Sequence, residues 1–184
     1  PRRGYRLLES RYFLTYQPKR WPWIRRISPH YFYNVFLRLD NSLESSRGHW
    51  HFFEIQPRRG GRFGYFVETQ QDRPRTGFTV FQDLSGRRVV IPVGEYKWVQ
   101  GNAEYVSDPS APISVSLRQK FGTFYDGDYS GWESSVAVRA GARLQASLGW
   151  NRDNVSLRSG RFQDRKSTRL NSSHVSESRM PSSA

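Results

Sequence analysis

Hydrophobic and polar residues alternate strictly in three consecutive segments between Pro112 and Phe162. One set of alternate positions carries Ile, Val, Leu, Ala and Trp, and the other carries Ser, Gln, Gly, Asn and Arg. Successive side chains of a β-strand point to opposite faces of a sheet, so a period of two predicts strands. Asp126, Gly127 and Asp128 fall between the first two segments and are the residues of a predicted hairpin turn. The stretch therefore predicts an antiparallel β-meander.

The rest of the chain has the same character. Aromatic and β-branched residues alternate with polar ones over short runs, and Gly, Pro, Asn and Asp punctuate them, which is typical of strands joined by turns. Further strands are expected at residues 6–16, 30–40, 49–56, 62–69, 77–82, 87–91 and 95–106. Residues 18–29 contain three prolines and are expected to form a loop. The predicted fold class is all-β, with an antiparallel meander.

The end of the chain is expected to have a different origin from the rest. Residues 164–174 and 178–184 resemble successive parts of a translated sequencing adapter, with 175–177 where a sample index falls. The alternative is a natural Ser-rich disordered tail. We expect 1–163 to be a partial β-barrel domain and 164–184 to be an artefactual disordered tail on a metagenomic sequence. Since the chain opens at Pro1, we also expect it to be an internal fragment of a longer protein.

Composition narrows the function classes. The 29 Lys and Arg residues against 16 Asp and Glu give a net charge of +13, or +11 without the four basic and two acidic residues of the tail. Absence of cysteine excludes a disulfide scaffold, a thiol nucleophile and a thiolate zinc site. Basic residues interleaved with 12 Phe, 10 Tyr and 6 Trp could bind nucleic acid. The arginines are spread through nearly every turn, however, which makes nucleic acid an unlikely partner.

Two readings of the alternation remain open. The longer strands have about the 9–11 residues that cross a bilayer at a tilt, and a polar face suits a wet lumen. On this reading Tyr125, Tyr129, Trp132 and Trp150 lie at the membrane interface, where Trp and Tyr are enriched. In a soluble β-sandwich the same pattern would mean core and solvent. The alternation by itself does not separate the two.

Two groups of residues could bind a metal. Asp126 and Asp128 could bind Ca²⁺ or do acid–base chemistry, but an Asp-Gly hairpin turn explains them without a ligand. His49 and His51 lie two apart and so share one face, whereas Glu54 points the other way if the strand is regular. We therefore expect neither a metal nor a cofactor.

One basic turn could bind phosphate. Arg58, Arg59 and Arg62 surround Gly60-Gly61, but no Gly-Lys-Ser/Thr sequence follows, so this is not a P-loop. A basic hairpin loop is the default interpretation. No nucleophile elbow or base partner accompanies the serines, so we expect no enzymatic activity.

Four blocks resemble a known family. They are residues 91–98 (Ile-Pro-Val-Gly-Glu-Tyr-Lys-Trp), 121–128 (Phe-Gly-Thr-Phe-Tyr-Asp-Gly-Asp), 150–157 (Trp-Asn-Arg-Asp-Asn-Val-Ser-Leu) and 160–162 (Gly-Arg-Phe). Their order and spacing are similar to the C-terminal, outer-membrane β-barrel-like domain of unknown function in bacterial proteins that begin with a module like the family-9 carbohydrate-binding modules. None of these residues is a family catalytic residue.

The resemblance implies a fold, a location and partners. The implied fold is a transmembrane β-barrel of which the antiparallel meander forms part, open or incomplete in this fragment. It implies a bacterial cell outer membrane, with outer-membrane lipid as the partner and carbohydrate as a second partner through an N-terminal module that would precede Pro1. It also implies a non-catalytic anchor or passage for a carbohydrate-associated surface protein. The alternative function is a soluble basic all-β module that binds nucleic acid or acidic polysaccharide.

Overall fold

The computed structural model describes residues 4–140 and 144–168, and in these ranges the chain is all-β and antiparallel, as predicted. No helix long and apolar enough to span a membrane occurs in the described ranges. The strands are β1 (Tyr5–Phe13), β2 (Ile24–Ile27), β3 (His30–Arg38), β4 (Leu43–Pro57), β5 (Arg62–Asp72), β6 (Phe78–Gln82), β7 (Arg88–Ile91), β8 (Tyr96–Val106), β9 (Ile113–Phe124), β10 (Gly127–Ala140), β11 (Leu144–Leu157) and β12 (Gly160–Thr168).

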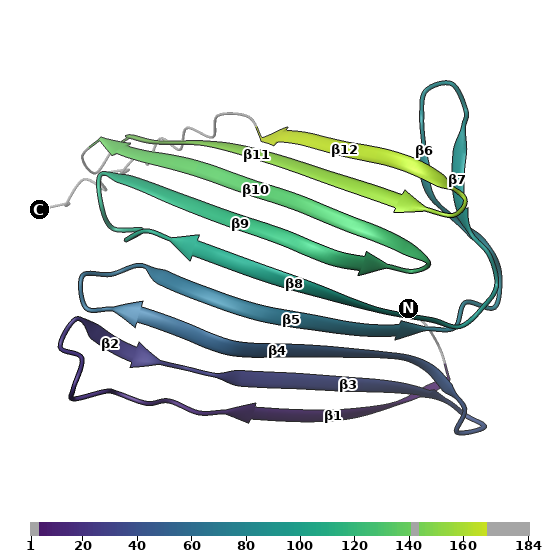
Figure 1. Ribbon diagram of the computed structural model, residues 1–184, viewed down its shortest axis with the longest axis horizontal. Coiled ribbons are helices and arrows are strands. Elements are labelled where there is room, and N and C mark those ends of the chain that lie inside the picture. Colours follow the sequence, from purple (N-terminus) through teal and green to yellow (C-terminus); the bar gives the residue numbers. More distant parts are fainter. Residues whose placement is uncertain (1–3, 141–143, 169–184) are drawn as a thin grey trace, which may run out of the picture.

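Ten strands form one broad sheet in the order β1-β3-β4-β5-β8-β9-β10-β11-β12, with β2 paired to β4 (Figure 1). Sequential neighbours pair through short connections, the pattern of a meander. The sheet is open over the described residues, with β1 and β12 as its edges. Strands β6 and β7 form a separate hairpin in the connection from β5 to β8.

The sheet has two distinct ends. We call one the hairpin end, because β6 and β7 lie there (Figure 1). We call the other the basic end, after basic side chains of the connections 14–23 and 58–61. Those side chains are Lys19, Arg20, Arg58 and Arg59. Basic side chains also occur at the hairpin end, among them Arg73, Arg75 and Arg87.

Pairing extends the strands beyond the predicted ranges. Residues 24–27 were expected in a loop but form β2, where Ile27 pairs with Ile55 and Ile24 is buried. Strand β12 was not expected, and it runs five residues past the predicted domain boundary at 163, from Asp164 opposite Asp153 to Thr168. The prediction that the disordered tail begins at 164 is therefore wrong for 164–168, because backbone hydrogen bonding to β11 requires no apolar pattern. Residues 169–184 and 141–143 lie outside the described residues.

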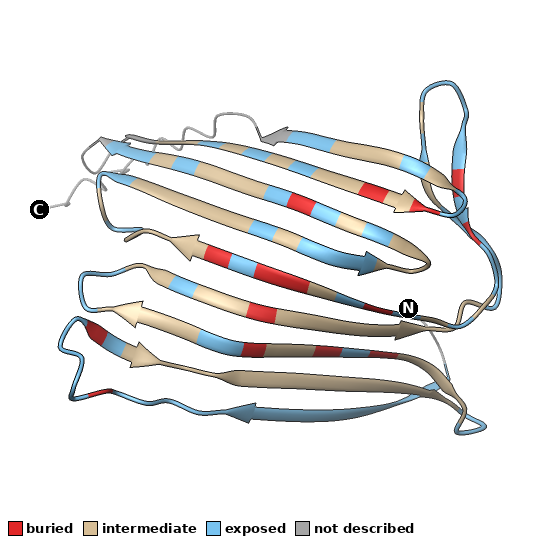
Figure 2. Ribbon diagram, in the orientation of Figure 1, coloured by how far each residue is buried: buried red, intermediate tan, exposed pale blue. Residues whose placement is uncertain are grey.

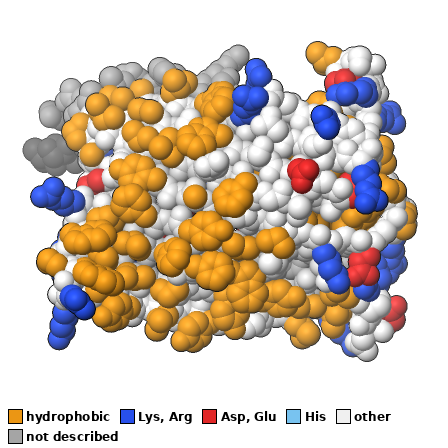
Figure 3. Space-filling model, viewed as in Figure 1, with side chains coloured by type: hydrophobic (Ala, Val, Ile, Leu, Met, Phe, Trp, Pro, Cys, Tyr) orange, Lys and Arg blue, Asp and Glu red, His pale blue; other side chains and the backbone are white. Residues whose placement is uncertain are grey.

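The pleat sorts the side chains of the sheet into two faces. The apolar face is rich in aromatic and aliphatic residues, and Figure 3 shows hydrophobic side chains spread widely over it. Its members include Leu8, Tyr12, Tyr31, Tyr33, Val35, Trp50, Phe63, Tyr65, Val67, Val99, Ala103, Tyr105, Ile113, Val115, Leu117, Phe121, Trp132, Val136, Val138, Leu148 and Trp150. The polar face carries most of the charged side chains of the central strands. Its members include Arg47, His49, His51, Arg62, Glu68, Asn102, Glu104, Arg118, Lys120, Tyr129, Glu133 and Asp153.

The small hydrophobic core lies at the hairpin end. Val89 and Ile91 of β7 are almost completely buried against Val155 and Leu157 of β11 (Figure 2). The ring of Phe81 stacks on that of Phe162, with centroids 4.6 Å apart. Since Val155 is on the same face as Tyr129, its partner in the ladder, the β6–β7 hairpin covers one end of the polar face.

Val89→Ala tests this packing. Loss of two buried methyl groups is expected to lower the free energy of unfolding by about 1–2 kcal/mol. Val90→Ala is the matched control, because the adjacent Val90 is 37% exposed and its loss should change stability by less than about 0.5 kcal/mol. Urea unfolding of the two variants under the same conditions measures the difference, and equal effects would contradict a docked hairpin.

Candidate functional site

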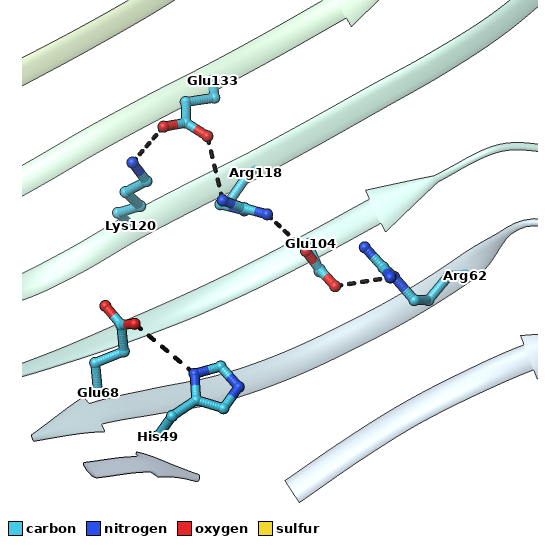
Figure 4. A network of polar contacts seen from close by, with 7 residues as sticks. All are labelled: His49, Arg62, Glu68, Glu104, Arg118, Lys120 and Glu133. Atoms are coloured by element: carbon cyan, nitrogen blue, oxygen red, sulfur yellow. Dashed lines mark hydrogen bonds and ion pairs between the residues drawn. The ribbon is translucent and has the colours of Figure 1, made fainter. Parts of the chain in front are cut away.

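A network of paired charges occupies the centre of the polar face (Figure 4). Its most buried member is Glu104 on β8, whose side chain is only 5% exposed. The Nη2 of Arg118 on β9 donates to Glu104 Oε2 at 3.0 Å, and the Nε of Arg62 on β5 forms an ion pair with Oε1, also at 3.0 Å. A buried carboxylate is costly unless it is paired, and two guanidinium groups from flanking strands meet that requirement.

The network continues across the next strand. Glu133 on β10 contacts Arg118, with Nη1 and Oε2 3.5 Å apart, and accepts a hydrogen bond from Lys120 Nζ. These residues meet because β9 places Arg118 opposite both Glu104 and Glu133 in the antiparallel ladder. Opposite charges directly across a sheet attract each other, so the pairing also favours this strand register.

A second group lies beside the first. Glu68 on β5 accepts a hydrogen bond from Arg47 Nη2 at 3.0 Å, and its Oε1 lies 3.7 Å from His49 Nδ1. Tyr129 on β10 donates to Asp153 Oδ1 on β11 at 2.7 Å. The acidic and basic members of both groups are equal in number if His49 is neutral, so the polar face is nearly balanced in charge. Most charges on this face have an opposite charge nearby, so few charges remain uncompensated even where the face is partly shielded from water.

Three histidines lie together next to this network. His49 and His51 share a face, as predicted, and His30 at the start of β3 pairs with His51 in the ladder. One ring nitrogen from each lies within 4.8 Å of the others, and this is the sole group of three potential metal ligands within 4–140 and 144–168. No sequence signal pointed to His30, because it precedes His49 by 19 residues and only the β3–β4 pairing brings them together.

Glu54 is on the polar face, contrary to what a regular strand would give. A β-bulge between His51 and Phe53 adds a residue to β4, so Glu54 pairs with Gly64 and lies on the same face as His51. A bulge shifts the alternation by one residue, which reverses the face of everything beyond it. Glu54 Oε1 accepts a hydrogen bond from Gln56 Nε2 at 3.0 Å.

The four aromatic residues expected at a membrane interface divide between the faces. Trp132 and Trp150 lie on the apolar face and are 38% and 42% exposed. Tyr129 points to the polar face, and Tyr125 stacks on Trp98 at 4.3 Å and donates to Asp72 Oδ2 at 3.0 Å. Of the four, only the two tryptophans therefore lie on the apolar face.

The predicted hairpin turn lies one residue earlier than expected. Phe124 pairs with Gly127, so the chain reverses at Tyr125 and Asp126, and Tyr125 has a φ of 51°. Gly127 and Asp128 are the first residues of β10. An added β-carbon at Gly127 would lie 1.9 Å from the carbonyl oxygen of Ser156, so only glycine fits there.

The basic turn at Gly60-Gly61 does not form a phosphate cradle. Arg58 and Arg59 lie in the exposed connection from β4 to β5, where both glycines have a positive φ. Arg62 is committed to Glu104 on the polar face. Arg58 and Arg59 therefore lie in an exposed connection, whereas Arg62 lies on the polar face.

Carboxylates close several turns outside the strands. The Ser110 hydroxyl donates to Asp108 Oδ1 at 2.7 Å, and this bond and the Ser110 amide hold the pKa of Asp108 below its usual value. The Ser85 hydroxyl acts in the same way on Asp83 in the β6–β7 turn, at 2.6 Å, and lowers its pKa. A depressed carboxyl pKa means that the stabilisation is present above the ordinary pKa and is lost as pH falls through the lowered one.

Together these features define an all-β protein whose broad antiparallel sheet has an apolar face and a charge-paired polar face. No family model matches the chain, and neither a curated protein nor a solved structure matches it.

Proposed function

We propose that the chain is part of a bacterial outer-membrane β-barrel that acts as a non-catalytic anchor or passage for a carbohydrate-associated surface protein. In this arrangement the apolar face contacts lipid and the polar face lines the lumen. The carbohydrate association rests on the family resemblance of residues 91–98, 121–128, 150–157 and 160–162. The arrangement of the apolar face supplies the structural support.

The apolar residues of the apolar face form a band that crosses the strands at a slant, which we call the apolar band. This slant is the single observation that supports the proposal most. Residues that are paired from strand to strand form a row across the sheet. One such ladder changes from apolar to charged between β1 and β8. It runs through Leu8, Val35, Ser46, Gln71 and Lys97. A ladder closer to the basic end stays apolar much further, from β1 to β9, before it becomes polar on β10. It runs through Tyr12, Tyr31, Trp50, Val67, Gly101, Phe121 and Ser130.

On β10 and β11 the apolar residues lie closer still to the basic end, at Val136, Val138 and Leu148. From β11 to β1 the band thus moves toward the hairpin end by about one residue per strand. With a rise of about 3.3 Å per residue and about 4.8 Å between strands, this corresponds to a tilt of roughly 35–40°. The strands of transmembrane barrels are tilted by about 35–45° from the barrel axis. An apolar belt that lies parallel to the membrane plane would therefore cross the strands at this slant.

The distribution of burial also favours a membrane. The large residues of the apolar face are exposed, among them Leu148 at 61% and Ile113 at 62%, whereas Glu104 and Asn102 on the polar face are buried. In a soluble sandwich the apolar face would be the covered one. Apolar surface of this extent on a soluble protein would be an aggregation hazard, and lipid removes that hazard.

The lengths of the strands fit the same proposal. Strands β5 and β8 each have 11 residues, and β9 has 12. About 9–11 residues cross the hydrocarbon layer at such a tilt. The β6–β7 hairpin folds over the polar face, so in a barrel it would narrow the lumen at one end.

Tryptophan fluorescence tests which face meets lipid. Two variants retain a single tryptophan, Trp150 or Trp98, and replace the other five with Phe. Both are folded into vesicles whose acyl chains are brominated close to the headgroups, at the depth expected for an interfacial tryptophan. Trp150 on the apolar face should be strongly quenched, and Trp98, which is 5% exposed among polar-face residues, should be nearly unaffected.

The same samples distinguish the alternatives. Co-sedimentation with vesicles and heat-modifiable migration on gels are the expected behaviour of a barrel. A chain that stays in the supernatant, shows no quenching of Trp150 and binds single-stranded nucleic acid or acidic polysaccharide in a salt-sensitive manner would overturn the proposal in favour of a soluble basic module.

A further inference from the structure

We propose that His30, His49 and His51 bind a divalent transition-metal ion of the zinc class on the polar face. The proposal is independent of the membrane proposal, because it depends only on the pairing of β3, β4 and β5. Three imidazoles with an open fourth position are a common ligand set for Zn²⁺. Imidazole also suits Cu²⁺ and Ni²⁺, so the nitrogen set defines the class of metal and not a single element.

The arrangement of the three rings fits a shared ion. Their centroids are 4.6 Å apart for His30 and His51, 5.7 Å for His30 and His49, and 5.6 Å for His49 and His51. The ring nitrogens lie within 4.8 Å of one another. Nitrogens bound at 2.0–2.1 Å in a tetrahedral site are about 3.3 Å apart, so closure requires movements of about 1.5 Å or less. Rotations about χ1 and χ2 supply shifts of this size without moving the strands.

A hydrogen bond orients one of the rings, and a carboxylate faces a second. His30 Nδ1 lies 3.0 Å from the carbonyl oxygen of Ser28, and a carbonyl only accepts, so Nδ1 holds the proton and Nε2 presents its lone pair. His49 Nδ1 faces Glu68 Oε1 at 3.7 Å, and Arg47 Nη2 donates a hydrogen bond to the same oxygen at 3.0 Å. Metal-binding histidines usually donate their second ring N–H to a carbonyl or a carboxylate in this way.

The third ring has a buried nitrogen that lacks a partner. His51 is 6% exposed, and its Nε2 has no hydrogen-bond partner among the described residues. It lies over Gly64, where an added β-carbon would be 2.8 Å away. A buried polar atom without a partner is costly, and a bound ion or an ordered water would remove that cost.

Carboxylates as well as aromatic rings surround the three histidines, and this environment suits a bound cation. Phe13 stacks on His30 with centroids 5.5 Å apart, and the buried Phe66 contacts His49 at 4.7 Å, so aromatic rings flank the histidines on two sides. Glu68 is adjacent, and the bulge in β4 turns Glu54 toward His51. Two carboxylates near the rings would balance the charge of the ion.

Calorimetric titration of the metal-free full chain, folded in detergent, with ZnCl₂ tests the proposal, and Co²⁺ serves as a spectroscopic probe of coordination geometry. One ion per chain and the intense visible absorption of tetrahedral Co²⁺ are expected. His30→Phe, His49→Phe and His51→Phe should each weaken binding by about 100-fold, and Glu68→Gln by about 10–100-fold. Binding should also weaken as the pH falls, because protons compete with the ion for the ring nitrogens.

The chain offers a matched control in its fourth histidine, His174. His174→Gln should leave the affinity unchanged, and gel migration and unfolding in detergent verify that each variant is folded. Loss of binding in His174→Gln, or affinity unchanged in a folded His51→Phe variant, would overturn the proposal. Failure of vesicle insertion with intact zinc binding would refute the membrane proposal alone.

Discussion

Leu117→Arg is expected to destabilise the folded chain in a bilayer by about 2–4 kcal/mol. Leu117 lies near the middle of the apolar band on β9, between Ser134 of β10 and Tyr105 of β8 in the ladder. A guanidinium group there would contact hydrocarbon, and the cost of a charge on the lipid face is greatest at the bilayer midplane. Urea unfolding in vesicles, followed by tryptophan fluorescence, measures the loss.

Ser116→Arg is the matched control, because it places the same side chain on the polar face of the same strand. Ser116 lines a cavity of about 260 Å³ with Arg118, Glu133 and Asn151, which leaves room for a hydrated side chain. The expected loss is less than about 1 kcal/mol. Equal losses for the two variants, or a larger loss for Ser116→Arg, would contradict the assignment of the apolar face to lipid.

Glu104→Ala is expected to lower the free energy of unfolding by about 2–4 kcal/mol. Removing one partner of a buried ion pair leaves uncompensated charge, which costs about 3–5 kcal/mol when both partners are fully buried. Arg62 and Arg118 are 39% and 37% exposed, so solvent screening reduces that figure here. Arg118 also retains Glu133 as a partner. Chemical unfolding of the variant in detergent measures the change.

Glu133→Ala provides the comparison. Glu133 is 32% exposed, so its removal should cost about 1 kcal/mol or less. A double-mutant cycle with Glu104→Ala and Arg62→Ala should give a coupling free energy of about 1 kcal/mol or more. A coupling near zero would show that the short contact between Arg62 and Glu104 contributes nothing to stability.

The two faces of the sheet differ in exposure in the opposite sense to a soluble β-sandwich, in which the apolar face is the covered one. The alternation in Ile113, Val115 and Leu117 establishes that the two faces of β9 differ, but it does not establish which face is covered. That depends on what lies against each face. In the folded sheet the central acidic groups are buried in ion pairs, and the aromatic and aliphatic side chains are exposed. This distribution favours the barrel proposal over a soluble sandwich.

Long strands with a regular period were predictable from the sequence, and the irregular ones were not. Residues 30–38 and 113–124 were expected almost to the residue, because alternation and flanking turn residues are local signals. Strand β2 was missed, because its four residues lie among prolines and are held by pairing with β4. The bulge that turns Glu54 to the polar face was also missed, because a bulge depends on the partner strand.

By itself the sequence determined the all-β class and the two unlike faces of the meander. It also indicated a chain reversal near Asp126, displaced by one residue from the observed turn. These features depend on neighbours within a few residues. Only the tertiary structure decided which distant residues meet: Glu104 with Arg62 and Arg118, and His30 with His49 and His51. The physical reason is strand register, because the alignment of antiparallel strands is set by the whole sheet and places residues far apart in the chain on one ladder.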